Sequence, residues 1–282
     1  MLEKTVNIPV KTIRTIKNRN CPLCKHDNTK SRPLRYSDEE WRLKKCSRCD
    51  FVYLENVPEY QDLSETFSWE KTSVIRDTER RTKHRLMTAL SKKTRWRLHF
   101  FKRKKIEDLV ASHLLQGIVL DIGCGTGDHL KLLPEHFIPC GIEISQSLAD
   151  IATKNLSIRN GWVINKPALH GLLKIDSASI DCIIMRAYLE HESQPREVLE
   201  NVCRVLKPGG IIIIKVPNYS SLNRRIMGKR WCALRFPDHM NYFTVKTLRH
   251  MVVQCGFRIK CFSFLDHLPT SDNMWLVGET VA

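Results

Sequence analysis

Residues 119–127, VLDIGCGTG, decide the fold because a short apolar run with an acid near its end leads straight into a glycine-rich turn. Beyond this turn, apolar runs of strand length alternate with amphipathic stretches of helix length. The runs lie at 118–122, 138–144, 162–164, 180–186, 211–216, 257–264 and 274–281. Strands that are continuously apolar and alternate with helices predict an α/β fold, with a parallel sheet covered by helices on both faces.

The glycine turn departs from the dinucleotide-binding fingerprint G-x-G-x-x-G. Gly123 and Gly125 match the fingerprint, but Asp128 stands where the third glycine belongs. A pyrophosphate binds a helix N-terminus through its negative charge, and Asp121 and Asp128 would repel it here. They would tolerate S-adenosylmethionine (SAM), which carries a sulfonium and an ammonium but no phosphate. The alternative is a turn that only joins a strand tightly to a helix.

Glu143 is a second indication of a nucleoside ligand. It ends the apolar run that follows the turn, sixteen residues after Gly127. An ionised carboxylate offers two acceptor oxygens and can bind both hydroxyls of a ribose. The alternative is a solvated acid at the end of a strand.

Four of the eleven cysteines form two C-x-x-C pairs that are separated by 21 residues. This spacing predicts a structural zinc site, because four thiolates fill a tetrahedral coordination sphere and leave no open position. The predicted ligands are Cys21, Cys24, Cys46 and Cys49. Unligated thiols are the alternative. We expect chelation to unfold residues 21–55 and to leave the α/β domain folded, since so small a module has little core of its own.

Taken together, the motifs resemble those of a class I SAM-dependent methyltransferase. The matching pieces are VLDIGCGTG, GIEIS, IDCIIMRAYLEH, VLKPGGIIIIKVPN and PDHMNYFTVKTLRHMVVQCGF, in this order. The chain is most similar to the bacterial methyltransferase-23 and ubiquinone-methyltransferase-like group, many of which carry a zinc-ribbon leader like CPLC…CSRCDFVYLENVPEY…FSWEKT. The resemblance implies a Rossmann-like, seven-stranded sheet whose last strand is antiparallel, together with a small N-terminal zinc-ribbon module.

The resemblance also implies which residues bind the cofactor. The methionine part of SAM would lie against the glycine turn, the ribose against a carboxylate and the adenine against an apolar side chain. The implied residues are Asp121, Gly123, Cys124, Gly125, Glu143, Ile144 and, through its main chain, Arg186. Relatives often place an acid after the third strand to bind the adenine amino group, whereas this chain has Asn165 and Lys166 there. The side-chain oxygen of Asn165 or backbone carbonyls can take that place.

Two histidines follow strands whose ends border the expected acceptor site. His191 lies in AYLEHES and His239 in FPDHMNYF. An imidazole with a pKa of about 6.5 can take the proton of an acceptor hydroxyl, so both are candidate catalytic bases. The alternatives are structural, with His191 capping the helix that begins at Pro195 and His239 anchoring its loop.

Two segments combine positive charge with aromatic side chains. Residues 76–105 hold 13 Lys or Arg against two acids, so a net charge of +11 out of the chain's +16 lies there. We expect a helix that is a solvated linker, an anionic-membrane contact or a nucleic-acid contact. Residues 220–237, SSLNRRIMGKRWCALRFP, form an insertion with five cations. They predict either a lid over an anionic acceptor or a surface flap with core aromatics.

The length of 282 residues, of which 42% are apolar, fits one large domain with a small accessory module. We expect a zinc-ribbon-like module at 1–55, a connecting basic helical segment at 56–116 and a methyltransferase domain at 117–282. No apolar run reaches the roughly 18 residues of a membrane span, and the N-terminus lacks the apolar region of a secretory signal. These features predict a cytoplasmic protein, with peripheral contact at the inner membrane surface as an option for the basic segment.

The expected enzyme is a SAM-dependent methyltransferase that O-methylates a sugar, a glycan precursor or another small metabolite, and that carries a structural Zn²⁺. One alternative is an RNA methyltransferase that holds its substrate with the ribbon and the basic segment. Another is a non-catalytic SAM-binding protein on the same scaffold. The sequence leaves the acceptor atom and the oligomeric state open.

Overall fold

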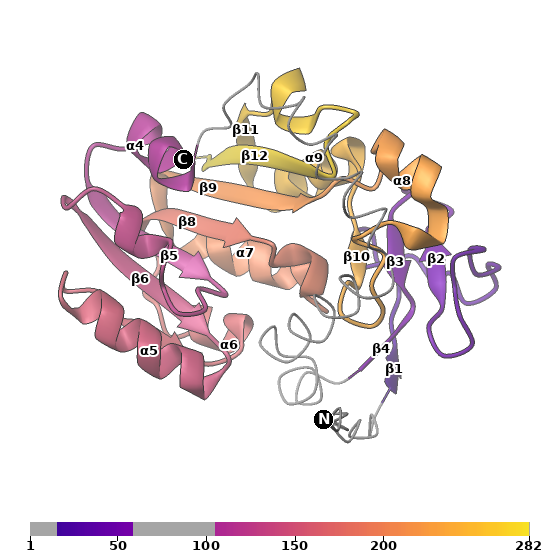
Figure 1. Ribbon diagram of the computed structural model, residues 1–282, viewed down its shortest axis with the longest axis horizontal. Coiled ribbons are helices and arrows are strands. Elements are labelled where there is room, and N and C mark those ends of the chain that lie inside the picture. The colour runs from indigo at the N-terminus through magenta and orange to yellow at the C-terminus, as the bar shows by residue number, and fades with distance from the viewer. Residues whose placement is uncertain (1–15, 59–104, 282) are drawn as a thin grey trace, which may run out of the picture. The chain divides into compact units, whose positions relative to one another are not determined.

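The computed structural model describes residues 16–58 and 105–281 (Figure 1). Nearly all of the basic segment predicted at 76–105 lies outside these residues. The chain divides into two compact units, one of Met1–Lys17 with Pro58–Arg103 and one of Asn18–Val57 with Lys104–Ala282. The second unit contains both the cysteine pairs and the α/β domain.

A seven-stranded sheet forms the centre of the second unit. Its strand order is β11-β12-β9-β8-β5-β6-β7, and β12 runs antiparallel to both of its neighbours while the β7-to-β9 part is parallel. The prediction of a mostly parallel sheet with an antiparallel last strand is confirmed. The strands are β5 (Gly117–Ile122), β6 (Phe137–Glu143), β7 (Val163–Asn165), β8 (Ile180–Arg186), β9 (Leu206–Pro217), β11 (Phe257–Cys261) and β12 (Asn273–Thr280).

Side chains of β8 alternate between two cores, as a strand buried on both faces requires. Ile183 and Met185 face one core, and Cys182 and Ile184 face the other. Helices α6, α7 and α9 pack on the first side, and α4 and α5 on the second. The helices are α4 (Ile106–His113), α5 (Gln146–Ser157), α6 (Ala168–Leu172), α7 (Pro195–Val205), α8 (Leu222–Met227) and α9 (Val245–Gln254).

Short 3-10 turns connect several of these elements. They are η2 (Leu130–Leu132), η3 (Leu189–His191), η4 (Gly228–Arg230) and η5 (Phe264–His267). The amphipathic pattern predicts that residues 128–133 begin a helix after the glycine turn. The structure has only the single turn η2 there, because Pro134 disfavours a helical conformation for the residue before it. No helix dipole therefore follows the glycine turn directly.

The cysteine-bearing segment shares a sheet and a core with the α/β domain. Its strands β2 (Leu43–Lys45) and β3 (Val52–Leu54) continue into β10 (Asn241–Tyr242), a strand that follows the 220–237 insertion (Figure 1). A separate two-stranded ladder joins β1 (Ile16–Asn18) to β4 (Asn56–Pro58). Phe51 and Tyr53 belong to the same core as the residues of α7 and α9.

Among the described residues, the helices are all too short or too polar to cross a lipid bilayer.

Candidate functional site

The glycine turn lies where β5 ends, between β6 and β8, which is the edge of the sheet at which α/β folds of this kind bind ligands. Gly123, Gly125 and Gly127 all have positive φ angles, of +77°, +57° and +75°. A side chain at Gly125 would meet no atom within 4 Å, while one at Gly123 would approach the Tyr188 ring to 3.2 Å. The turn therefore forms an open cradle over Gly125, with Tyr188 beside it.

The side chain of Glu143 stabilises the glycine turn through hydrogen bonds to the backbone. Its carboxylate accepts hydrogen bonds from the backbone N–H groups of Gly125 and Ser145, both at 2.9 Å. The side-chain amide of Asn165 donates to the carbonyls of Glu143 and Ile144 at 2.9 and 3.0 Å. Asn165 thus stabilises the end of β6, where the residues expected to contact the ribose and the adenine lie. Both of these hydrogen bonds use the amide nitrogen of Asn165 and not its side-chain oxygen.

Asp121 adds a second buried carboxyl group next to the cradle. It is 7% exposed, and burial raises its pKa to about 7, with Arg186 opposing and Glu143 reinforcing the shift. Burial also raises the pKa of Cys124, so this residue behaves as a buried neutral thiol. By contrast, Asp128 is exposed and forms an ion pair of 2.6 Å with Lys131.

This chemistry tests whether SAM fits. Two buried carboxyl groups, an open glycine cradle and the lack of a helix directly after the turn disfavour a pyrophosphate and suit a cationic nucleoside. The carboxyl groups that can face a cationic ligand are Asp121 and Glu143, since Asp128 is exposed and paired with Lys131. The residues present fit SAM.

His191, from η3, lies in a network with the loop that precedes β10. Its Nδ1 atom is 3.0 Å from the Asp238 carboxylate and 2.8 Å from the Asp238 carbonyl oxygen. Arg235 donates to the other carboxylate oxygen of Asp238 at 2.6 Å. Burial alone would lower the pKa of His191, but the charge and hydrogen bond of Asp238 outweigh it and raise this pKa. His191 does not cap α7, whose N-cap residue is Gln194.

His239 lies against His191, with ring centroids 4.6 Å apart in an edge-to-face arrangement. Its Nδ1 atom lies 2.8 Å from the carbonyl oxygen of Ala233, which anchors the loop. Burial lowers the pKa of His239 well below the ordinary value, and the nearby charge of His191 lowers it further. The structure thus brings together the two histidines that the sequence analysis selected from distant positions.

Two acidic members of this cluster were missed. Glu190 and Asp238 each precede one of the two histidines, in LEH and PDH. Glu190 is 2% exposed, and burial raises its pKa. Their positions directly before the two histidines could have indicated them. Adjacency along a chain does not, however, show whether two side chains point to the same site.

The 220–237 insertion contributes core side chains. Trp231 is 2% exposed, and its indole N–H donates to Asp272 at 2.7 Å. Tyr242 and Phe243 are also buried. Trp231 of the insertion, and Tyr242 and Phe243 just after it, thus pack as core side chains, as the prediction of a surface flap with core aromatics requires.

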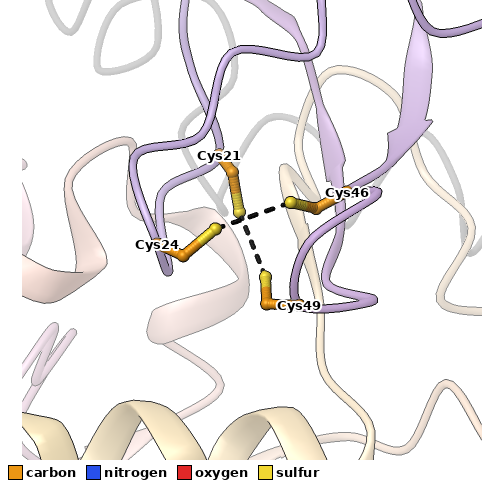
Figure 2. Close-up of side chains that lie close together, drawn as sticks. All are labelled: Cys21, Cys24, Cys46 and Cys49. Carbon is orange, nitrogen blue, oxygen red and sulfur yellow. Dashed lines mark hydrogen bonds between the residues drawn. The ribbon is translucent and has the colours of Figure 1, made fainter.

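The four cysteines of the two pairs converge, as Figure 2 shows. The sulfurs of Cys21 and Cys49 are 3.5 Å apart, as are those of Cys24 and Cys46. A tetrahedral zinc ion with Zn–S bonds of about 2.3 Å separates its sulfur ligands by roughly 3.8 Å. The cluster therefore has the size and ligand set of a four-thiolate zinc site.

The cysteine segment also contacts the loop that carries His239. In the β3–β10 ladder Tyr53 pairs with Asn241. The Asn241 side chain in turn donates to the carbonyls of Leu189 and Glu192 at 2.7 and 2.6 Å, on either side of His191. Asn241 therefore connects the cysteine segment to both histidine-bearing loops.

Comparisons with known proteins agree with this architecture. Residues 94–261 match the protein family described as "Methyltransferase domain". The ubiquinone biosynthesis O-methyltransferase of Coxiella burnetii is 31% identical over 130 residues, which cover 45% of this chain and 53% of that protein. The tRNA (carboxymethyluridine(34)-5-O)-methyltransferase of Arabidopsis thaliana is 30% identical over 118 residues, 42% of this chain and 28% of that protein.

The chain spans 28% to 67% of the length of the curated relatives considered. Among solved structures, a chain in the complex between the Haloferax volcanii Trm112 methyltransferase activator and a methyltransferase gives a TM-score of 0.52 at 15% identity. It covers 63% of this chain and 89% of that one. At such low identity this likeness shows the fold alone.

Proposed function

The chain belongs to the family of methyltransferase domains that residues 94–261 match, and from this premise we propose that it transfers the methyl group of SAM to a hydroxyl group. The observation that carries the proposal is the cradle over Gly125, which is held by the Glu143 carboxylate and left open to a ligand. When bound, SAM supplies an electrophilic methyl carbon on a sulfonium. The chain's own residues bind it, orient the acceptor and receive a proton.

Each cofactor-binding residue has a proposed role. Asp121, once ionised, would attract the ammonium of SAM, and the Gly123–Gly127 turn with the buried Cys124 would hold the methionine part. Glu143 accepts hydrogen bonds from the ribose hydroxyls with the lone pairs that its two backbone donors leave. Ile144 would pack on the adenine. The main chain of Arg186, at the end of β8, would border the cofactor.

The acceptor side is proposed to lie at His191 and His239. Tyr188 joins the two sides, because its ring lies beside Gly123 and its carbonyl accepts a hydrogen bond from the His191 backbone at 2.9 Å. In-line displacement needs the acceptor oxygen, methyl carbon and sulfur aligned, and this positioning is worth several kcal/mol, up to about 7–11. The hydroxyl proton would pass to the histidine cluster, in which Asp238 favours a protonated His191.

We propose a sugar, a glycan precursor or another small metabolite as the acceptor. The similarity to the Coxiella O-methyltransferase supports an oxygen acceptor. Residues 1–55 are proposed as a zinc-ribbon-like module, with Cys21, Cys24, Cys46 and Cys49 as ligands of a structural Zn²⁺ that holds the β3–β10 ladder in place.

Two matched glycine variants test the cofactor site. Gly125 and Gly209 both have positive φ and open space where a Cβ atom would lie, so Gly125→Ala and Gly209→Ala carry similar backbone strain. SAM titration calorimetry should show weaker binding by tenfold or more for Gly125→Ala and unchanged binding for Gly209→Ala. Equal affinities in the two variants, or no SAM binding by the wild-type chain, would contradict the proposed site.

An RNA acceptor is the second candidate. The similarity to the Arabidopsis tRNA methyltransferase and the net charge of +16 favour it. Labelled SAM added to a cell extract, followed by separation into small molecules, glycolipid, RNA and protein, distinguishes the two. Label in the small-molecule or glycolipid fraction supports the first proposal, and label in RNA supports the second.

A further inference from the structure

We propose that Glu190, His191 and His239 form a binding site for a divalent transition-metal ion on the acceptor side. The three residues come from η3 and from the loop before β10, and their ligand atoms all lie within 4.8 Å of one another. This inference deepens the proposed function, because the ion would lie where the acceptor hydroxyl is to be activated.

The hydrogen bonds of the two imidazoles have the pattern found around metal-bound histidines. A ligating histidine normally donates one ring N–H to a carboxylate or a backbone carbonyl, which fixes the ring and directs the other nitrogen to the metal. His191 Nδ1 bonds to Asp238, and His239 Nδ1 bonds to the Ala233 carbonyl. Both rings are therefore anchored through Nδ1, and Nε2 is the nitrogen available to a cation.

Glu190 supplies the second, independent observation. Its side chain is 2% exposed, and its Oε2 atom is buried with no hydrogen-bond partner among the described residues. Leaving a buried carboxyl oxygen without a hydrogen-bond partner is unfavourable, because the group has lost its hydration without gaining a replacement. A cation between Glu190 and the two histidines would give this oxygen a partner.

The donor set indicates the class of ion. Two imidazole nitrogens with one carboxylate suit Zn²⁺, Fe²⁺ and similar ions, and leave an open coordination position for an oxygen ligand. Such a site differs from the four-thiolate cluster at Cys21, Cys24, Cys46 and Cys49, whose sulfur ligands fill the coordination sphere. Bond lengths of about 2.0–2.2 Å require the three donor atoms to move closer together by small side-chain rotations.

An ion here would lower the pKa of an acceptor hydroxyl beside it. The hydroxyl proton leaves to solvent, the oxygen–methyl bond forms, and the methyl–sulfur bond breaks with its electron pair going to sulfur. With the ion bound, His191 and His239 act on the acceptor as ligands rather than as bases. Metal dependence of turnover therefore separates this arrangement from direct base catalysis.

The test is the zinc content of the full chain after equilibration with Zn²⁺ and removal of unbound metal by gel filtration. Wild-type protein should hold two Zn²⁺ ions per chain, one in each cluster. Glu190→Gln, which keeps the side-chain size, and His239→Gln should each hold one. The exposed His170→Gln is the matched control and should hold two.

A wild-type chain that holds only one zinc ion would overturn the proposal, as would a second ion that persists in both variants. Since the wild-type count is decisive alone, a variant that fails to fold does not rescue the idea. Substitution with Co²⁺ gives a second readout, because the second ion should add visible bands without the sulfur-to-cobalt charge transfer of the first. SAM calorimetry on the same samples separates this result from failure of the proposed function.

Discussion

Arg19 joins the cysteine segment to the acceptor loops, and its replacement by methionine should loosen those loops. Its guanidinium donates to the carbonyls of Leu54, Ser193 and Met240 at 2.9, 2.8 and 2.8 Å, and to the side chain of Asn241 at 3.0 Å. Burial lowers the pKa of Arg19 only to about 10, so the group remains charged at neutral pH. Methionine keeps the aliphatic stem and removes all four donors.

The size of the effect follows from these contacts. Hydrogen bonds from a charged donor contribute about 1.5–3 kcal/mol each, but part of the gain is offset by the cost of burying the guanidinium. We therefore expect Arg19→Met to lower the free energy of unfolding by about 3–5 kcal/mol, because four neutral acceptors lose their donor at roughly 1 kcal/mol or more each. This is a large share of the roughly 5–15 kcal/mol that stabilises a typical domain.

Urea unfolding measures the loss of stability, and hydrogen exchange of residues 238–243 measures the loosening, neither of which requires a known acceptor. Exchange in this segment should rise in Arg19→Met, while SAM affinity changes less than about twofold because the glycine turn receives no bond from Arg19. The matched control is Arg48→Met, which removes an exposed arginine from the same segment. If the free energy of unfolding falls by less than about 1 kcal/mol in both variants, and residues 238–243 exchange at the same rate in both, then Arg19 does not couple the cysteine segment to the acceptor loops.

Four further predictions concern the metal, the cofactor, the pH dependence of stability and the packing of the fold. Removal of zinc by a chelator should unfold residues 21–55 and also raise exchange at 238–243, with SAM binding retained; protein that contains no zinc before chelation would contradict this. SAM affinity should fall by up to about tenfold per pH unit below pH 7 and calorimetry should detect proton release on binding, because Asp121 with its pKa of about 7 must ionise to attract the ammonium; Asp121→Asn should remove this pH dependence. Because the pKa of Asp121 is raised in the folded chain, its carboxyl group keeps its proton up to a higher pH there than in the unfolded chain. Its contribution to the stability of the fold therefore decreases as the pH rises from about 4 to 7. Gly117→Ala should cost about 1–3 kcal/mol in thermal unfolding, since a methyl group there would lie 2.5 Å from the Asp181 carboxyl carbon at a φ of +138°; a loss comparable to that of Gly209→Ala would refute it.

Local sequence patterns predict much of the fold. The apolar run before Gly123 and the alternation that follows it specify strands and helices, because side-chain periodicity depends only on neighbouring residues. The parallel sheet was predictable on this basis, and the C-x-x-C spacing placed four sulfurs that do converge. The single turn η2 in place of a helix shows where a nearby proline outweighs an amphipathic pattern.

The acceptor side was only partly predictable. His191 and His239 could be selected because each follows a strand at the binding edge, but the orientation of Glu190 and Asp238 depends on how two loops meet 47 residues apart. Likewise, no sequence pattern around Arg19 predicts that it bonds to the acceptor loops. Its four acceptors are scattered along the chain and converge only after folding.

The sequence by itself therefore determined the sheet, the glycine cradle and the sulfur cluster, since each is encoded within a short stretch or a fixed spacing. Only the tertiary structure decided that the cysteine segment pairs with β10 and that a buried carboxylate faces two anchored imidazoles. The physical reason is that pairing across long sequence separations is chosen by shared burial and hydrogen bonding among whole elements. No local pattern of residues records that choice.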